Sequence, residues 1–177
     1  IVRHGHRHDH GSHAERQIVD KRYDVKLTKI GEWMAFKTGM ELIDEIGRDK
    51  QIMFVSSPFH RCLQTSDFML CGMISSETKV YKNCIFVEDI VREHAYPSNF
   101  TLEDYKNLIF FGGEKATFLD TEYNKLEELR GFDDMMKNHP ETNEHTTART
   151  KAILAQMTKF VLKNPNVVPI VVTHSYS

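Results

Sequence analysis

Four side chains in this sequence have the properties needed for chemistry on a phosphate group. They are Arg3 and His4 near the start of the chain, Arg61, and His174 near its end. A neutral imidazole can attack phosphorus, and a guanidinium group matches two phosphate oxygens at once. Gly5, directly after His4, would let the backbone turn sharply and approach a bound anion. One nucleophile and three hydrogen-bond donors could therefore transfer a phosphoryl group through a phosphohistidine.

The first thirteen residues hold five of the ten histidines, which raises a second kind of chemistry. His4, His6, His8 and His10 alternate, so an extended segment would place them on one face as a divalent-metal site. Gly5 and Gly11 instead predict a loop at this point. We therefore expect no functional metal and only adventitious binding of nickel or zinc.

Strand and helix patterns alternate along the chain and position these residues. We expect strands at 1–3, 52–55, 80–87 and 167–173, with helices from Thr28 to Ile46, from Ser57 to about Leu70, from Thr101, over 122–136, and over a stretch that ends before Pro165. This alternation predicts an α/β fold, a three-layer sandwich in which a mostly parallel central sheet carries helices on both faces. Ligands of such sheets bind at the carboxyl ends of the strands. Arg3 and His4, Arg61, and His174 all follow predicted strands.

Side-chain spacing within the helices predicts which residues are buried and how each helix begins. Trp33, Phe36 and Met40 form a stripe that we expect to face the core. In the last helix the expected inner stripe is Ile153, Met157, Phe160 and Val161. Ser57 is expected to be an N-cap, with Pro58 at the first helical position, and to contact phosphate only if its hydroxyl turns inward. Arg61 would then lie in the first turn, where the helix dipole favours an anion.

The overall composition excludes several classes of function. The chain has 177 residues, with 23 basic and 25 acidic side chains and a net charge of −2, so we expect no nucleic-acid partner. No apolar run approaches the roughly 20 residues of a membrane span, so no membrane association is expected. The three cysteines form no C-x-x-C pair, which indicates a reducing, cytoplasmic location. With no repeat or linker, residues 1–177 are expected to form a single domain that is trimmed at both ends.

Short motifs at the predicted strand ends resemble the histidine phosphatase superfamily, which has the phosphoglycerate-mutase-like fold. These motifs are V-R-H-G at 2–5, S-S-P-x-x-R-C-x-Q-T at 56–65 and T-H at 173–174. Further motifs are similar to the T-cell-signalling suppressor and ecdysteroid-phosphate phosphatases, namely R-H-G-x-R-x-D at 3–9, L-T-x-x-G at 27–31 and V-E-x-x-x-x-E at 87–93. The resemblance extends over nearly the whole chain.

The resemblance implies a role for each matching residue. His4 would be the phosphorylated nucleophile, with Arg3, Arg7, Arg61 and His174 around the phosphate. Glu93 would be the general acid that protonates the leaving group and the base that then activates water, although Glu88, Asp89 and Glu103 are nearby alternatives. The superfamily uses no metal and no organic cofactor.

These observations together predict a metal-independent phosphomonoester hydrolase of the histidine acid phosphatase type. Its substrate would be a small-molecule or phosphoprotein phosphomonoester, and a homodimer is left open. A catalytically weak phosphate- or phosphoprotein-binding module is an alternative, because Ser175 stands where the branch has glycine and the chain stops at Ser177. A phosphoglycerate-type mutase is disfavoured, because residues 6–9 replace the Glu/Gln-Ser segment that follows R-H-G in mutases.

Overall fold

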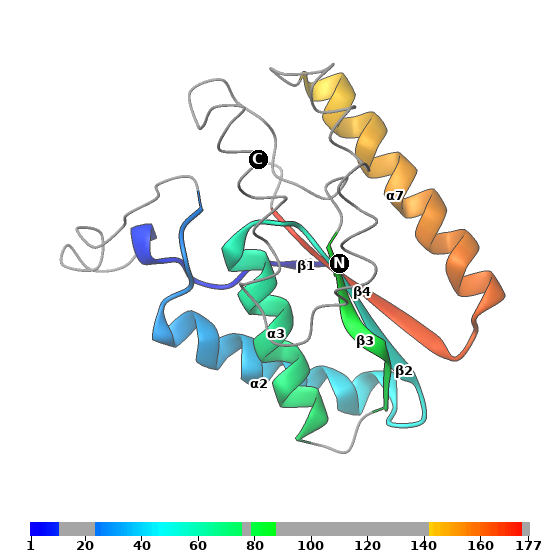
Figure 1. Cartoon of the computed structure of the whole chain (residues 1–177), viewed down its shortest axis with the longest axis horizontal. Coiled ribbons are helices and arrows are strands. Elements are labelled where there is room, and N and C mark those ends of the chain that lie inside the picture. The colour runs from blue at the N-terminus through cyan, green and yellow to red at the C-terminus, as the bar shows by residue number, and fades with distance from the viewer. Residues whose placement is uncertain (11–23, 76–78, 88–141, 175–177) are drawn as a thin grey trace.

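The computed structural model describes residues 1–10, 24–75, 79–87 and 142–174 (Figure 1). Its elements are β1 (Val2–Arg3), the 3₁₀ turn η1 (His8–His10), α2 (Lys29–Ile46), β2 (Gln51–Ser56), α3 (His60–Ile74), β3 (Lys79–Val87), α7 (Asn143–Lys163) and β4 (Val167–Thr173). The expected helices from Thr101 and over 122–136 lie outside the described residues. The other expected elements are present, with ends shifted by a few residues.

The four strands form one sheet in the order β1-β4-β2-β3, and the three pairings between them are parallel. Alternate residues of β2 face opposite sides of this sheet, as the geometry of a strand requires. Ile52 and Phe54 pack with α2 and α3 on one face, whereas Met53 and Val55 pack with α7 on the other. The expected three-layer α/β sandwich is therefore confirmed.

Helix α2 begins and ends where the sequence predicts. The Thr28 hydroxyl accepts a hydrogen bond from Gly31 N at 3.0 Å and so caps the first turn. Gly47 ends the helix with a φ of 95°, a left-handed conformation that favours glycine.

The side of α2 that faces the core differs from the prediction. Trp33 is 60% exposed and Met40 is 41% exposed, so the expectation that this apolar stripe is buried is wrong. The buried residues of α2 are instead Gly31, Ala35, Gly39 and Ile43. A Cβ atom at Gly39 would collide with the Met69 carbonyl of α3, so the two helices approach closely only because a small residue lies there. Close backbone packing, not the largest apolar side chains, determines which face is inward.

Helix α7 covers the other face of the sheet and ends at Lys163, before Pro165 as expected. Ile153 is buried, and Met157 and Phe160 pack beside it. Val161 is 38% exposed, so its expected place in the inner stripe is wrong. At 3.6 residues per turn, Val161 lies about 80° around the helix from Ile153, whereas Phe160 lies only about 20° away.

The start of α3 also departs from the prediction. The N-cap position is Phe59, which makes no side-chain capping hydrogen bond, and Ser57 and Pro58 precede the helix. The Ser57 N-cap expectation is therefore wrong. The carboxylate of Asp24, distant in the sequence, accepts the hydrogen bond from His60 N at 2.6 Å.

The sheet brings three strand ends together at one edge of the molecule. Val172 of β4 is level with Val2 of β1 on one side and with Ser56 of β2 on the other. The residues that follow these strands, His4, Ser57 and His174, must consequently meet at this edge. No helix in the described ranges is both long and apolar enough to span a membrane.

Candidate active site

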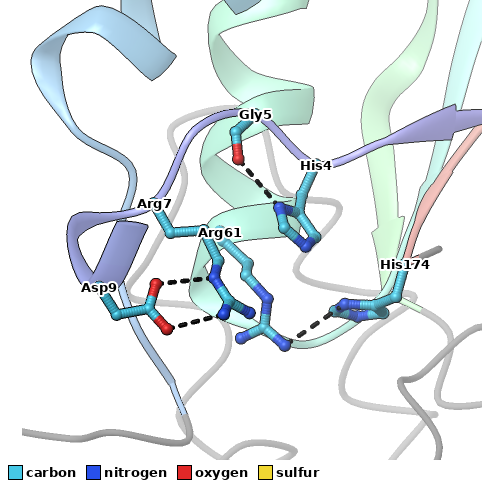
Figure 2. Close-up of polar contacts among 6 residues, drawn as sticks. All are labelled: His4, Gly5, Arg7, Asp9, Arg61 and His174. Atoms are coloured by element: carbon cyan, nitrogen blue, oxygen red, sulfur yellow. Dashed lines mark hydrogen bonds and ion pairs between the residues drawn. The ribbon is translucent and has the colours of Figure 1, made fainter. Parts of the chain in front are cut away.

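The carboxyl edge of the sheet gathers four of the six residues that the sequence singled out. His4 follows β1, His174 follows β4, Arg61 lies in the first turn of α3, and Arg7 lies in the loop after His4 (Figure 2). The ring centroids of His4 and His174 are 5.3 Å apart. The Nη2 atom of Arg61 lies 3.3 Å from Nδ1 of His174. These contacts join residues that are more than 100 positions apart in the chain.

His4 is buried and its imidazole is held in one tautomer. Its backbone N donates to the Thr173 carbonyl at 3.1 Å, and its Nδ1 lies 2.9 Å from the Gly5 carbonyl oxygen. A carbonyl oxygen can only accept, so Nδ1 must carry the proton. The lone pair of the neutral ring is therefore on Nε2, the nitrogen that a nucleophile would use.

The electrostatic surroundings keep His4 neutral. Burial lowers its pKa to about 4; the hydrogen bond to Gly5 opposes this shift, and the charges of Arg61, Arg7 and Arg3 add to it. At neutral pH the ring is consequently uncharged. A neutral imidazole among guanidinium groups is suited to attack an anion that those groups also bind.

Arg61 is fully buried, with 1% of its surface exposed. Its guanidinium carbon lies 4.4 Å from the ring centre of Phe59, so an aromatic face supports the cation. The start of α3 adds the positive end of the helix dipole at the same place. Both features favour an anion beside Arg61, in agreement with the expected first-turn position of this residue.

His174 has the opposite tautomer from His4. Arginine can only donate, so Nδ1 of His174 accepts from Arg61 and Nε2 carries the proton. That proton points to the Ser57 hydroxyl at 2.9 Å, and the Cys62 sulfur lies 3.4 Å from the same nitrogen. Burial lowers the pKa of His174 well below its usual range, and the charge of Arg61 adds to the effect. His174 is therefore also neutral at physiological pH.

Arg7 reaches this site as half of an ion pair. Its Nε and Nη2 donate to the two carboxylate oxygens of Asp9 at 2.8 and 2.7 Å. Its charge lowers the pKa of both His4 and His174, so the guanidinium acts on both rings. In the view of Figure 2, the Arg7–Asp9 pair and His174 lie on opposite sides of Arg61.

Arg3 differs from these four residues in its exposure. Arg3 ends β1 opposite Thr173; it is exposed, and its charge contributes to the lowered pKa of His4. Glu93 lies outside the described residues.

Side chains that the sequence analysis did not assign to the site hold the loop after β1 in place. Gly5 N donates to the Thr65 hydroxyl at 3.0 Å, and that hydroxyl donates to the Arg61 carbonyl at 2.7 Å. Gly5 also lies close to the start of α2, because a Cβ at this position would be 3.2 Å from the Gly31 carbonyl. Of the residues missed, Ser57 could be predicted from the sequence, because it directly follows a predicted strand.

Two of the alternating histidines, His4 and His6, contact different partners. The Nδ1 atom of His6 contacts the Thr28 hydroxyl at 2.9 Å, and that of His4 contacts Gly5. Among the described residues, no group of three histidine, cysteine or acidic side chains could hold a metal ion. Neither Cys62 nor Cys71 is part of a disulfide.

Comparison with known proteins agrees with the motifs. Residues 1–76 match the family model of the histidine phosphatase superfamily (branch 1), and this stretch contains the R-H-G, L-T-x-x-G and S-S-P-x-x-R segments. The resemblance is thereby confirmed for this part of the chain at the level of the superfamily. A solved structure described as Mycobacterial hydrolase 1 is 14% identical, with a TM-score of 0.46 over 97% of this chain and 72% of that one. No curated protein matches the chain.

Proposed function

We propose that this protein is a metal-independent phosphomonoester hydrolase that acts through a phosphohistidine on His4. The observation that carries the proposal is the state of His4: a neutral ring with its lone pair on Nε2, held beside Arg61 and His174. A phosphatase or a mutase of the superfamily would use such a residue. The absence of the mutase segment after Gly5 supports hydrolysis.

The first step transfers the phosphoryl group to the enzyme. Nε2 of His4 attacks phosphorus, and the bond from phosphorus to the leaving oxygen breaks with its electron pair on that oxygen. Glu93 donates the proton that the leaving oxygen needs. The ring of His4 becomes cationic, and its Nδ1–H bond to the Gly5 carbonyl stabilises that charge.

The second step returns the enzyme to its starting state. Water attacks phosphorus, the nitrogen–phosphorus bond breaks, and the carboxylate of Glu93 accepts the proton of the water. Inorganic phosphate leaves, and His4 is neutral again. No metal is required, because Arg3, Arg7 and Arg61 balance the charge of the phosphate, each hydrogen bond to a charged group contributing about 1.5–3 kcal/mol.

Trapping the phosphoenzyme tests the nucleophile. With an aryl phosphate labelled at phosphorus, the wild-type chain should form an acid-labile adduct and turn over, and His4→Asn should do neither. His145→Asn, which removes an exposed histidine of α7, is the matched control and should retain both properties. A His4→Asn protein that still became labelled would overturn the assignment. Phosphate binding without turnover in the wild type would favour a binding module, and interconversion of phosphoglycerates would favour a mutase.

Turnover rates on two kinds of phosphate ester test the role of Glu93. If Glu93 protonates the leaving group, Glu93→Gln should slow alkyl phosphates far more than activated aryl phosphates such as the 4-nitrophenyl ester, whose leaving groups depart without a proton. Glu88→Gln and Glu103→Gln are the matched variants, and whichever shows this selective loss identifies the acid. An equal loss on both kinds of substrate would remove the role from Glu93.

A further inference from the structure

The first turn of α3 receives its cap from another part of the chain. The backbone N–H groups of a first turn have no partner within the helix, and a side-chain oxygen at the N-cap position usually accepts one of them. Phe59 at this position cannot do so. Asp24, which is 36 residues earlier and only 8% exposed, accepts from His60 N instead. A buried carboxylate at a helix N-terminus also interacts favourably with the dipole.

The segment that contains Asp24 connects α3 to the loop that carries His4. Leu27 N donates to the side-chain oxygen of Gln64 in α3 at 2.8 Å. On its other side, the Lys26 carbonyl accepts from His8 N at 3.1 Å, and Thr28 N donates to the His6 carbonyl at 3.0 Å. Residues 24–28 therefore hydrogen-bond both to α3 and to the loop after His4.

The position of Arg61 depends on this arrangement. Arg61 follows His60 directly, so a change in the first turn would move the guanidinium. Such a movement would disturb the 3.3 Å contact of Arg61 with His174 and its position over Phe59. The side chain is fully buried, so it has little room to restore these contacts.

We propose that Asp24 is a positioning residue of the phosphate site: through His60 N it holds the first turn of α3, and with it Arg61, against His174. The proposal rests on the proposed function, because it assigns Asp24 to phosphate binding. Asp24 itself does not touch the phosphate. A cap that only stabilised the helix would leave the affinity for phosphate unchanged in the folded protein.

Binding of inorganic phosphate by the whole chain, measured by calorimetry, separates the two roles. Asp24→Ala removes the acceptor and should weaken binding about tenfold or more, the loss expected when one hydrogen bond to a charged group is misplaced. Asp24→Asn keeps an oxygen acceptor and should stay within about threefold of the wild type. Asp44→Ala is the matched control, because it removes an exposed aspartate that pairs with Arg48 near the far end of α2.

A double substitution ties the effect to Arg61. If Asp24 acts through Arg61, Asp24→Ala should cause no further loss of phosphate binding in an Arg61→Ala background. A folded Asp24→Ala protein with wild-type affinity, or full additivity with Arg61→Ala, would overturn the proposal. If Asp24→Ala does not fold, Asp24→Ser replaces it, because its shorter side chain leaves His60 N out of reach, and the expectation is the same.

A measurement that needs no phosphate separates failure of this proposal from failure of the proposed function. The charge of Arg61, with those of Arg7 and Arg3, lowers the pKa of His4. In an NMR titration, Asp24→Ala should raise that pKa toward the value found in Arg61→Ala, and Asp44→Ala should not change it. A wild-type protein that bound no phosphate would contradict the proposed function, while this titration would still decide whether Asp24 holds Arg61.

Discussion

The two buried histidines of the site differ in where each neutral ring carries its proton. In His4 the Gly5 carbonyl keeps the proton on Nδ1, and in His174 the Arg61 guanidinium keeps it on Nε2. His4 therefore presents a lone pair on Nε2, and His174 presents a donor. The ring centroids of the two residues are 5.3 Å apart. The Gly5 carbonyl and the Arg61 guanidinium thus give two neighbouring rings of the same type different hydrogen-bonding properties.

The Ser57 hydroxyl should matter for His174 more than its place in a Ser-Pro sequence indicates. Ser57→Ala removes the hydroxyl acceptor of the buried Nε2–H, and within the described parts of the chain the weak Cys62 sulfur is what remains near it. We expect a loss of about 1–2 kcal/mol in the free energy of unfolding, near the low end for an unsatisfied buried donor, and weaker binding of phosphate. Urea unfolding and phosphate titration measure the two effects.

Ser56→Ala is the matched control for this prediction. Ser56 is equally buried in the same motif, but its hydroxyl donates to the neighbouring Ser57 carbonyl and does not bond to His174. Both variants should lose some stability, and only Ser57→Ala should lose phosphate affinity. Equal effects of the two substitutions on affinity would contradict the role of Ser57.

Residue types, together with the rule that ligands bind at the carboxyl ends of parallel strands, are sufficient to predict that His4, Arg61 and His174 come together. The same reasoning could not predict Asp24 or Thr65, because each acts on a backbone group 36 or 60 residues away in the sequence. Such side-chain-to-backbone hydrogen bonds produce no local pattern. The N-cap prediction for Ser57 fails for a related reason. Its local sequence fits an N-cap, whereas its partner, His174, follows β4, which is distant in the sequence.

At the scale of elements, α2 makes two kinds of close contact through glycine. A Cβ on Gly39 would collide with the Met69 carbonyl of α3, and a Cβ on Gly31 would collide with the His6 carbonyl in the loop that follows His4. The first contact sets the distance between two helices. The second sets the position of the loop after His4 against the start of α2.

The substitutions Gly31→Ala and Gly39→Ala should therefore have different consequences. Alanine favours a helix over glycine by up to about 1 kcal/mol, but a collision with backbone atoms costs more, about 1–3 kcal/mol. Both variants should be destabilised in urea, and only Gly31→Ala should also lose phosphate binding or turnover, because it displaces the loop. Thr38→Ala, at an exposed position of the same helix, should change neither property. Unchanged stability of both glycine variants would show that α3 and the loop after His4 can move away from α2 without cost.

The bounds of α2 were predictable from its cap, its terminal glycine and its apolar spacing, but its orientation was not. Trp33 and Met40 have the apolar character of core residues, whereas the buried line of Gly31, Ala35 and Gly39 has almost none. A hydrophobic pattern gives weight to large side chains. It does not predict a helix face that is buried because its small residues permit close contact with a neighbouring backbone.

At the scale of the whole molecule, a near-neutral chain contains a local concentration of positive charge. The net charge of −2 does not reveal it, because Arg3 and Arg7 at the start of the chain are brought near Arg61 of α3 only by the fold. Burying two histidines among these cations keeps both rings neutral. The resulting pKa shifts must appear in the stability of the protein as a function of pH.

The stability of the fold should fall as the pH drops below about 6.5. His4 has a folded pKa near 4 and an ordinary unfolded value of 6.5, so below 6.5 the unfolded chain binds more protons than the folded one. The stability that neutral His4 provides is fully present above pH 6.5 and is lost as the pH falls toward 4. His174, whose pKa is also lowered, adds a loss of the same sign. For His4 alone the expected loss between pH 7 and pH 5 is about 2 kcal/mol.

Comparison with His4→Asn isolates this contribution from the titration of carboxylates. The difference in unfolding free energy between the wild type and His4→Asn, measured by urea unfolding at several pH values, should fall by about 2 kcal/mol from pH 7 to pH 5. Saturating phosphate should reduce the fall, because an anion beside His4 favours the protonated ring and raises its folded pKa. A difference that did not vary with pH would mean that the pKa of His4 is not lowered in the folded state, and the electrostatic account of this ring would be wrong.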